Sequence, residues 1–359
     1  MAETKTKRAR GSKKKVDALT EHGISAELAL NLMRDMLLFR RFEEKAEEAY
    51  AIGKIGGFCH LHIGQEGGAA GAIKPLRVED YVISAYREHT QAISKGVDPK
   101  AVMAELYGRA GGSSGGKGGS MHIFGADVGF LGGHGIVGGQ IGLAIGAAWK
   151  IRYRDEDSVC VCFIGDAAVN QGAFHECLNM AAVWELPVIY VVENNEYGMG
   201  TAFSRVSKTD MSTKSAAYGI PDSCVNGQDV LATYAHFRDL VDGVRGGGGP
   251  RFVDLQTYRF RGHSMSDPVS GTYRPTEEVD RRKEQDDPIA ILRDHLFAAD
   301  VLGQATLEEM DAEAKQISQD AADFAENSPI PDAEALYTNV WATMNPNGRL
   351  FFDTRERPK

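Results

Sequence analysis

The chain has 359 residues, of which 43% are hydrophobic and 25% are charged. This is the composition of an ordinary globular protein, and it excludes collagen, a coiled coil and wholesale disorder. The sequence contains no run of about 20 apolar residues that would cross a membrane, and it does not open with a charged and then apolar leader. We therefore expect a soluble protein.

Positive charge is concentrated at the start of the chain. Residues 1–15 contain seven Lys and Arg residues and one Glu, whereas the whole chain carries a net charge of −10. The remaining body is therefore acidic, which argues against nucleic acid as the main partner. We expect residues 1–20 to form a disordered basic tail, residues 21–345 a single domain, and residues 346–359 a C-terminal tail.

The first half of the chain predicts two helices, a short strand and a long loop. From Ser25, a residue suited to an N-cap, apolar residues recur at helical spacing as far as Gly53. The small residues of segment 64–72 predict a second helix, and residues 81–84 predict a strand. The glycine-rich stretch 111–142 predicts a loop that closely approaches another group, because glycine loses the most backbone entropy on ordering.

The second half predicts alternating strands and helices. A helix of small residues is expected at 141–151, and the apolar runs 159–164 (VCVCFI) and 188–192 (VIYVV) are typical of strands buried on both faces. The apolar face of the segment around Phe174 predicts a helix between these runs, which gives a right-handed parallel βαβ unit. A further strand at 252–258 and acidic helices within 288–327 complete the prediction. The expected fold is α/β: a mostly parallel central sheet flanked by helices, with an N-terminal helical extension and C-terminal helices.

Two glycine motifs are similar to nucleotide-binding loops. Residues 111–118 (GGSSGGKG) nearly match a Walker A loop, but Gly118 occupies the position of the metal-binding Ser or Thr, and the preceding residues read as a helix. Gly133, Gly135 and Gly138 fit the GxGxxG pattern, but the preceding DVGFLG does not read as a buried strand. We therefore reject a P-loop and a Rossmann dinucleotide site.

Polar residues follow the two strands of the predicted βαβ unit. Gly165 and Asp166 follow the first strand, and Asn195 comes just after the second. The carboxyl ends of neighbouring parallel strands meet at one sheet edge, where carboxylate and amide oxygens suit Mg²⁺. The free amides of Ala167 and Ala168 begin the next helix and favour a phosphate. The pattern predicts a metal-bridged diphosphate site; an Asp N-cap and an Asn-rich turn are the structural alternative.

These residues resemble the thiamin-diphosphate signature GDG…NN, which reads GDA…NN here. The segments GFCHLHIGQE, SAYREH, GKGGSMHIF, GHGIVGG and RGHSMSDP occur in the same order as in the alpha subunits of the pyruvate dehydrogenase component of 2-oxo acid dehydrogenase complexes. The similarity runs from about residue 25 to about residue 345. It implies a thiamin-diphosphate-binding fold, with thiamin diphosphate and Mg²⁺ as cofactors.

The resemblance also implies the site residues. The metal ligands implied are the side chains of Asp166 and Asn195 and the main-chain carbonyl of Tyr197. Gly135 and Val137 match the loop that contacts the pyrimidine ring and supports the bent cofactor. The positions implied to contact the cofactor are Tyr86, Arg87, Gly135, Val137, Gly165, Asp166, Ala167, Ala168, Asn195, Tyr197 and His263.

Two histidines are the catalytic candidates that the resemblance implies. His263 matches a residue that contacts the diphosphate and assists acetyl transfer, and His60 matches one near the substrate carboxylate. Either imidazole is suited to transfer protons near neutral pH, although a lone His is more often structural. Ser264 matches a serine that is phosphorylated in some eukaryotic members. Ala167 departs from the signature's second Gly, and a positive φ there would strain the backbone by roughly 1 kcal/mol or more.

The function implied is the oxidative decarboxylation of pyruvate, with transfer of the acetyl group to the lipoyl group of an acyltransferase. The partner implied is a beta subunit, in an assembly of two alpha and two beta chains. Acetoin or branched-chain 2-oxo acid dehydrogenases remain alternatives, and Ala167 leaves open a non-catalytic scaffold subunit. The five cysteines form no CxxC pair and are odd in number, which favours reduced thiols in a reducing compartment. We expect a bacterial cytoplasmic protein. A basic transit peptide for the mitochondrial matrix or a plastid is the alternative.

Overall fold

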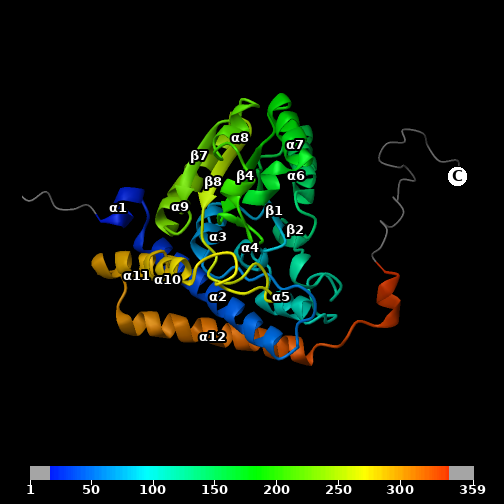
Figure 1. The fold of residues 1–359 in the computed structure, drawn as a ribbon, viewed down its shortest axis with the longest axis vertical. Coiled ribbons are helices and arrows are strands. Elements are labelled where there is room, and N and C mark those ends of the chain that lie inside the picture. Colours follow the sequence, from blue (N-terminus) through cyan, green and yellow to red (C-terminus); the bar gives the residue numbers. More distant parts are fainter. Residues whose placement is uncertain (1–16, 339–359) are drawn as a thin grey trace, which may run out of the picture.

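A parallel sheet flanked by helices forms the centre of the molecule in the computed structural model, which describes residues 17–338 (Figure 1). The six strands lie in the order β2, β1, β3, β4, β8, β7, and every neighbouring pair is parallel. Their bounds are β1 (Tyr81–Ala85), β2 (Phe130–His134), β3 (Cys160–Gly165), β4 (Val188–Asn194), β7 (Asp222–Asn226) and β8 (Arg251–Gln256). A short antiparallel ribbon, β5 (Tyr197–Gly198) with β6 (Thr201–Ala202), follows β4. The predicted α/β class is confirmed.

Strands β3 and β4 are buried on both faces, as their apolar runs predicted. Alternate residues of β3 belong to two different core clusters: Cys162 faces the cluster formed with helices α6 (Gly139–Arg154) and α7 (Gly172–Val183), whereas Phe163 faces the opposite one. Figure 1 shows α6 and α7 together on one side of the sheet. This alternation follows from the twofold side-chain period of a strand. The predicted βαβ unit is therefore present.

The remaining helices surround this unit. They are α1 (Ala18–His22), α2 (Ala26–Ala51), α3 (Glu66–Ile73), α4 (His89–Lys95), α5 (Pro99–Leu106), α8 (Thr213–Ala216), α9 (Val230–Gly243), α10 (Thr276–Gln285), α11 (Pro288–Ala298) and α12 (Gln304–Asn327). Figure 1 shows the long helices α2 and α12 lying alongside each other below the sheet. The Ser25 side chain accepts a hydrogen bond from the Leu28 amide at the start of α2, as an N-cap should. No helix of the described range is both long enough and apolar enough to cross a membrane.

The predicted boundary of the N-terminal tail lies too far along the chain. Residues 18–20 belong to α1, whose start is capped by Asp17 through its side-chain contact with the Thr20 amide at 2.8 Å. Residues 1–16 of the predicted tail lie outside the described residues, as does the predicted C-terminal tail, 346–359. All five cysteines are free thiols.

Part of the predicted loop 111–142 is regular structure. Residues 130–134 form β2 at the edge of the sheet, and α6 already begins at Gly139. The glycines of β2 hid this strand because they serve packing: Gly132 has φ +100°, and the Phe124 ring occupies the space that a Cβ atom would need. The prediction that DVGFLG contains no buried strand was therefore wrong for its last three residues, since β2 begins at Phe130. Strand β7, in which only Val225 is buried, was not predicted.

The Walker-like loop is wrapped around a carboxylate of the protein itself. Both oxygens of Glu105, a fully buried residue of α5, accept hydrogen bonds from four main-chain amides of the loop. The donors, at 2.6–3.2 Å, are the amides of Ser114, Gly116, Gly118 and Gly119. Rejection of a P-loop agrees with this arrangement, because the amides that would bind a phosphate are already paired.

Glu105→Gln should therefore destabilise the fold although it hardly changes the shape of the side chain. Whichever way the new amide turns, its NH₂ group faces two main-chain donors, and two buried hydrogen bonds are lost. We expect the free energy of unfolding to fall by about 2–5 kcal/mol, measured by urea denaturation. The exposed Glu309→Gln is the matched control and should change it by less than about 0.5 kcal/mol. Equal stability of the two variants would contradict this role of Glu105.

Candidate active site

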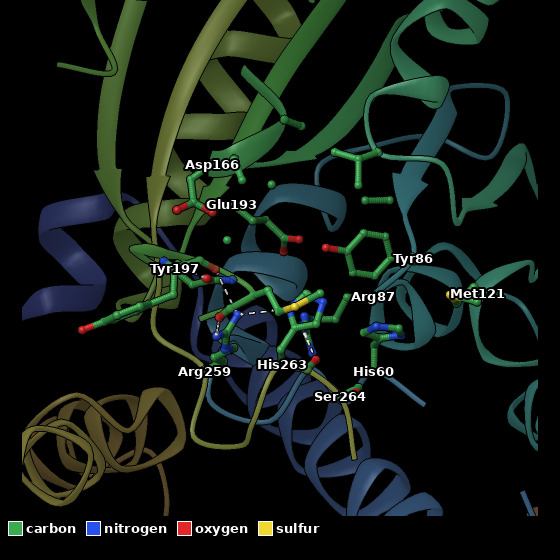
Figure 2. A pocket seen from close by; sticks show the side chains of 18 of the residues that line it. His60, Tyr86, Arg87, Met121, Asp166, Glu193, Tyr197, Arg259, His263 and Ser264 are labelled. Carbon is green, nitrogen blue, oxygen red and sulfur yellow. Dashed lines mark hydrogen bonds between the residues drawn. The ribbon is translucent and has the colours of Figure 1, made fainter. Parts of the chain in front are cut away.

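A cavity of about 630 Å³ lies at the carboxyl ends of β1, β3 and β4. The structure brings all the sequence-predicted site residues to this one cavity. Its walls include His60, Tyr86, Arg87, Gly135, Val137, Gly165, Asp166, Ala167, Ala168, Asn195, Tyr197 and His263. Figure 2 shows the labelled side chains around it, with Asp166 and Glu193 coming from the strand ends and Tyr86, His60 and His263 nearby.

Asp166 supplies a buried carboxylate with an unused oxygen. It is 2% exposed and begins a 3₁₀ turn immediately after β3. Its Oδ2 atom has no hydrogen-bond partner among the described residues, and burial raises the pKa of the carboxyl group to about 6 although Arg259 opposes this shift. A cation bound at this oxygen would favour the charged form. The carboxylate therefore suits a metal ligand better than it suits a structural cap.

Asn195 and Tyr197 complete the predicted set of oxygen ligands. The Asn195 side chain is oriented at both ends: Oδ1 accepts from the Tyr197 amide at 3.4 Å, and Nδ2 donates to Gln65 Oε1 at 3.1 Å. The Tyr197 carbonyl accepts from Arg259 at 3.0 Å. The described residues hold no cluster of three His, Cys, Asp or Glu side chains suited to a metal. One carboxylate, one amide and one carbonyl are instead typical of Mg²⁺, which shares its shell with phosphates and water.

The cavity wall contains two buried guanidinium groups. Arg87 donates to the carbonyls of Leu61 (2.6 Å) and His263 (2.7 Å), and Arg259 donates to those of Tyr197 and Met199. No carboxylate of the described residues lies within ion-pairing distance of either group. Burial, together with the neighbouring Arg259 charge, lowers the pKa of Arg87 to about 10, so it still carries its charge at neutral pH. Two buried cations without a carboxylate partner favour an anion such as a diphosphate in this cavity.

The backbone around the expected metal ligands is tightly shaped. Ala167 is not among the residues with positive φ, so its methyl group causes no backbone strain. A Cβ atom at Gly198 would collide with that methyl group, so a glycine opposite Ala167 makes room for it. Glu196 (φ 70°) and Met199 (φ 55°) do adopt the left-handed conformation, which non-glycine residues adopt mainly where the surrounding structure imposes it. Glu196 is also held by an ion pair with Arg282 of α10 at 2.8 Å.

The rings of His60, Tyr86 and His263 form another part of the cavity wall. The His60 ring centroid lies 4.6 Å from that of Tyr86 and 5.1 Å from that of His263. Burial and the Arg87 charge lower the pKa of His60 to about 2 and that of His263 to about 3. Both imidazoles are therefore neutral at physiological pH, able to accept or donate a hydrogen bond. His60 Nδ1 is buried and has no partner in the described range.

Ser264 is part of a closed local network. Its hydroxyl donates to Asp267 Oδ2 at 2.9 Å and lies 2.8 Å from the Ser266 hydroxyl, and the residue is 5% exposed. Buried Arg274 fixes the same loop by donating to three of its carbonyls, among them that of Arg261 at 2.5 Å. In this conformation the Ser264 hydroxyl is not presented to solvent.

Sequence reasoning missed several residues of the cavity wall, including Arg259, Glu193 and Met121. Arg259 had a usable signal, because it comes shortly after the predicted strand 252–258, and β8 is the neighbour of β4. Its charge belongs at the same sheet edge as Asp166. Glu193 also had one, as the first charged residue after an apolar run. Met121 had none, since it lies in the glycine-rich loop far from any strand end.

Substitution of His60 should change the acid stability of the protein. Above pH 6.5 neither the folded nor the unfolded chain protonates this residue. Below pH 6.5 the imidazole of His60 is protonated in the unfolded chain, whereas in the folded chain it stays neutral down to about pH 2. The free energy of unfolding therefore falls by about 1.4 kcal/mol for each pH unit because of this group. His60→Gln should reduce the slope by that amount between pH 6 and pH 3, followed by urea denaturation at each pH. His175→Gln, at an exposed position, is the control, and a slope unchanged in His60→Gln would contradict the expectation.

Comparison with known proteins adds independent information. Residues 34–334 match the protein family described as "Dehydrogenase E1 component". The chain is 48% identical over 317 residues to the pyruvate dehydrogenase E1 component subunit alpha of Rhizobium meliloti, covering 88% of this chain and 90% of the relative. It is 48% identical over 318 residues to the protein of the same name from Zymomonas mobilis, covering 88% of each chain. The Rickettsia bellii protein of that name is 45% identical over 309 residues, 86% of this chain and 94% of the relative.

Proposed function

Because the chain belongs to the dehydrogenase E1 component family, we propose that it catalyses the oxidative decarboxylation of pyruvate as the alpha chain of a thiamin-diphosphate-dependent dehydrogenase. The acetyl group passes to the lipoyl group of an acyltransferase. The observation that carries the proposal is the identity of 48% over 88% of the chain with relatives named pyruvate dehydrogenase E1 component subunit alpha. The cavity supports it, since every site residue predicted from the sequence lines that cavity.

The residues of the cavity fit thiamin diphosphate with Mg²⁺. Asp166 has an unpaired buried oxygen, Asn195 and Tyr197 add neutral oxygens, and Arg87 and Arg259 supply positive charge. The first three would hold the ion, and the main-chain amides after β3 together with the guanidinium groups would hold the diphosphate. When bound, thiamin diphosphate supplies the carbanion chemistry of the decarboxylation. The protein supplies position, charge and the exclusion of water.

Neutral imidazoles give the cavity its proton-transfer groups. His263 is proposed to contact the diphosphate and to assist acetyl transfer, and His60 to lie near the substrate carboxylate. Both rings are buried beside Tyr86 and close to Arg87, and their low pKa values leave a nitrogen lone pair available. Such a nitrogen acts as a general base or hydrogen-bond acceptor without first losing a proton.

A beta subunit is the expected partner, because the chain is similar to alpha subunits of a two-chain component. We propose an assembly of two alpha and two beta chains that covers the mouth of the cavity. Apolar side chains of the cavity wall and of the neighbouring loop are exposed there: Phe58 is 61%, Ile136 79%, Val137 43% and Met199 61% exposed. Leaving this apolar surface in water is unfavourable, and a partner that buries it would also complete the site. The bacterial relatives favour a cytoplasmic location.

The rate of acyl transfer to a lipoyl domain from three compounds tests the proposed substrate; acyl transfer is measured because acetoin has no carboxyl group to lose. The chain is co-expressed with its beta subunit and supplied with thiamin diphosphate and Mg²⁺, and the initial rates with pyruvate, acetoin and 2-oxoisovalerate are compared. Pyruvate should react fastest. A higher kcat/KM for acetoin would identify an acetoin dehydrogenase, and a higher kcat/KM for 2-oxoisovalerate would identify a branched-chain 2-oxo acid dehydrogenase.

Asp166→Ala distinguishes an enzyme from a scaffold. It removes the single carboxylate of the expected metal site, so metal-dependent binding of thiamin diphosphate to the alpha and beta pair should be lost in isothermal titration, while the circular dichroism spectrum stays native. Retained wild-type affinity would show that the metal site is misplaced. Absence of binding by the wild-type pair would leave only the scaffold interpretation.

His263→Ala separates acyl transfer from cofactor binding. We expect the rate of lipoyl acetylation to fall by about 10²–10⁴-fold, the usual contribution of a positioned acid or base, with a much smaller loss of cofactor affinity. The two quantities are measured on the same preparation with a lipoyl domain as acceptor. Losses of equal size would reduce His263 to a phosphate contact.

A further inference from the structure

We propose that Gln65 is a positioning residue, which fixes the atom of the Asn195 side chain that faces the metal ion. This inference rests on the proposed function of the cavity. The two ends of an amide group have nearly the same shape, but only the oxygen coordinates Mg²⁺, whereas the NH₂ group repels a cation. An Asn ligand therefore needs a partner that specifies its orientation.

The contacts of Asn195 supply that specification. Its Nδ2 donates to Gln65 Oε1 at 3.1 Å, and its Oδ1 accepts from the Tyr197 amide at 3.4 Å. If the amide of Asn195 were reversed, Nδ2 would face the N–H of Tyr197. Gln65 holds the NH₂ end away from the site, so the carbonyl oxygen is left on the side of the expected ion.

Gln65 is itself held in place. It is fully buried at the residue before α3, and its Oε1 also accepts from the hydroxyl of Thr257 at 3.0 Å. Thr257 follows β8, and its amide donates to the carbonyl of Asn194 at 2.9 Å. The oxygen of Gln65 therefore joins α3, the end of β8 and the loop after β4. Gln65 Nε2 has no hydrogen-bond partner within residues 17–338, so the acceptor oxygen is the functional end of this side chain.

Gln65→Met and Gln65→Glu form the decisive pair of variants. Methionine is similar in length and has no strong acceptor, so the NH₂ group of Asn195 loses its partner and the amide is free to turn. Glutamate keeps an acceptor oxygen at the same distance from Asn195 Nδ2. It loses no hydrogen bond by replacing the NH₂ group, because Gln65 Nε2 makes none within residues 17–338. Removing an outer-shell partner commonly lowers metal affinity 10- to 100-fold. We expect that loss for Gln65→Met and an affinity equal to or tighter than wild type for Gln65→Glu.

The measurement is the Kd of Mn²⁺ for the alpha and beta complex in saturating thiamin diphosphate, from the electron paramagnetic resonance signal of free Mn²⁺. Thermal unfolding of each variant without metal is recorded alongside it. Gln65→Asn, whose shorter side chain withdraws the acceptor, is a second loss variant if Gln65→Met does not fold, and it should also bind Mn²⁺ 10- to 100-fold more weakly.

Three outcomes would overturn the inference. Wild-type Mn²⁺ affinity in Gln65→Met or Gln65→Asn would show that Asn195 needs no such partner. Parallel losses of affinity and of unfolding temperature in the loss variants and in Gln65→Glu would make Gln65 a purely structural residue. Failure of the wild-type complex to bind Mn²⁺ at all would refute the proposed function itself, and with it any role of Gln65 toward a metal.

Discussion

The parallel pairing of β3 with β4 is the constraint on which the whole site depends. The strands are paired from Cys160 with Val188 to Gly165 with Glu193, so they end side by side, and both Asp166 and Asn195 lie just beyond them. The two apolar clusters on the faces of the sheet fix this register. A slip of one residue would turn every side chain of a strand to the other face. The placement of the polar ligands is therefore a consequence of how the apolar core packs.

Burial gives the cavity two kinds of group with different roles. Burial lowers the pKa of the imidazoles of His60 and His263, so both are neutral at physiological pH. Arg87 keeps its charge, because the ordinary pKa of a guanidinium group is much higher. Low polarity also strengthens the attraction of each remaining cation for an anion. In the same buried environment, the charged arginines are therefore suited to bind an anion, and the neutral histidines are suited to accept or donate a proton.

The sequence predicts the centre of the fold well and its margins poorly. The apolar runs of β3 and β4 are unambiguous, and parallel geometry then brings Asp166 and Asn195 to one edge without further information. Tyr86, Gly135 and His60 were placed by family resemblance, although Tyr86 directly follows β1 and Gly135 directly follows β2. Strand β2 was missed because its glycines make room for neighbouring side chains, Gly132 for Phe124 and Gly133 for Glu88, and have low strand propensity. The bond between Gln65 and Asn195 joins residues 130 positions apart, and only the folded chain reveals it.

The carboxylate of Glu105 inside its glycine-rich loop has a consequence for the recognition of nucleotide sites in general. A loop whose main-chain N–H groups converge favours an anion, but the anion can be a side chain of the protein itself. Here it is the carboxylate of Glu105, on the helix that comes just before the loop. A glycine-rich loop that encloses an anion therefore does not by itself reveal where the anion comes from. An acidic residue about ten positions upstream, on a helix facing the loop, is a simple sign that a side chain of the protein occupies the anion site of the loop.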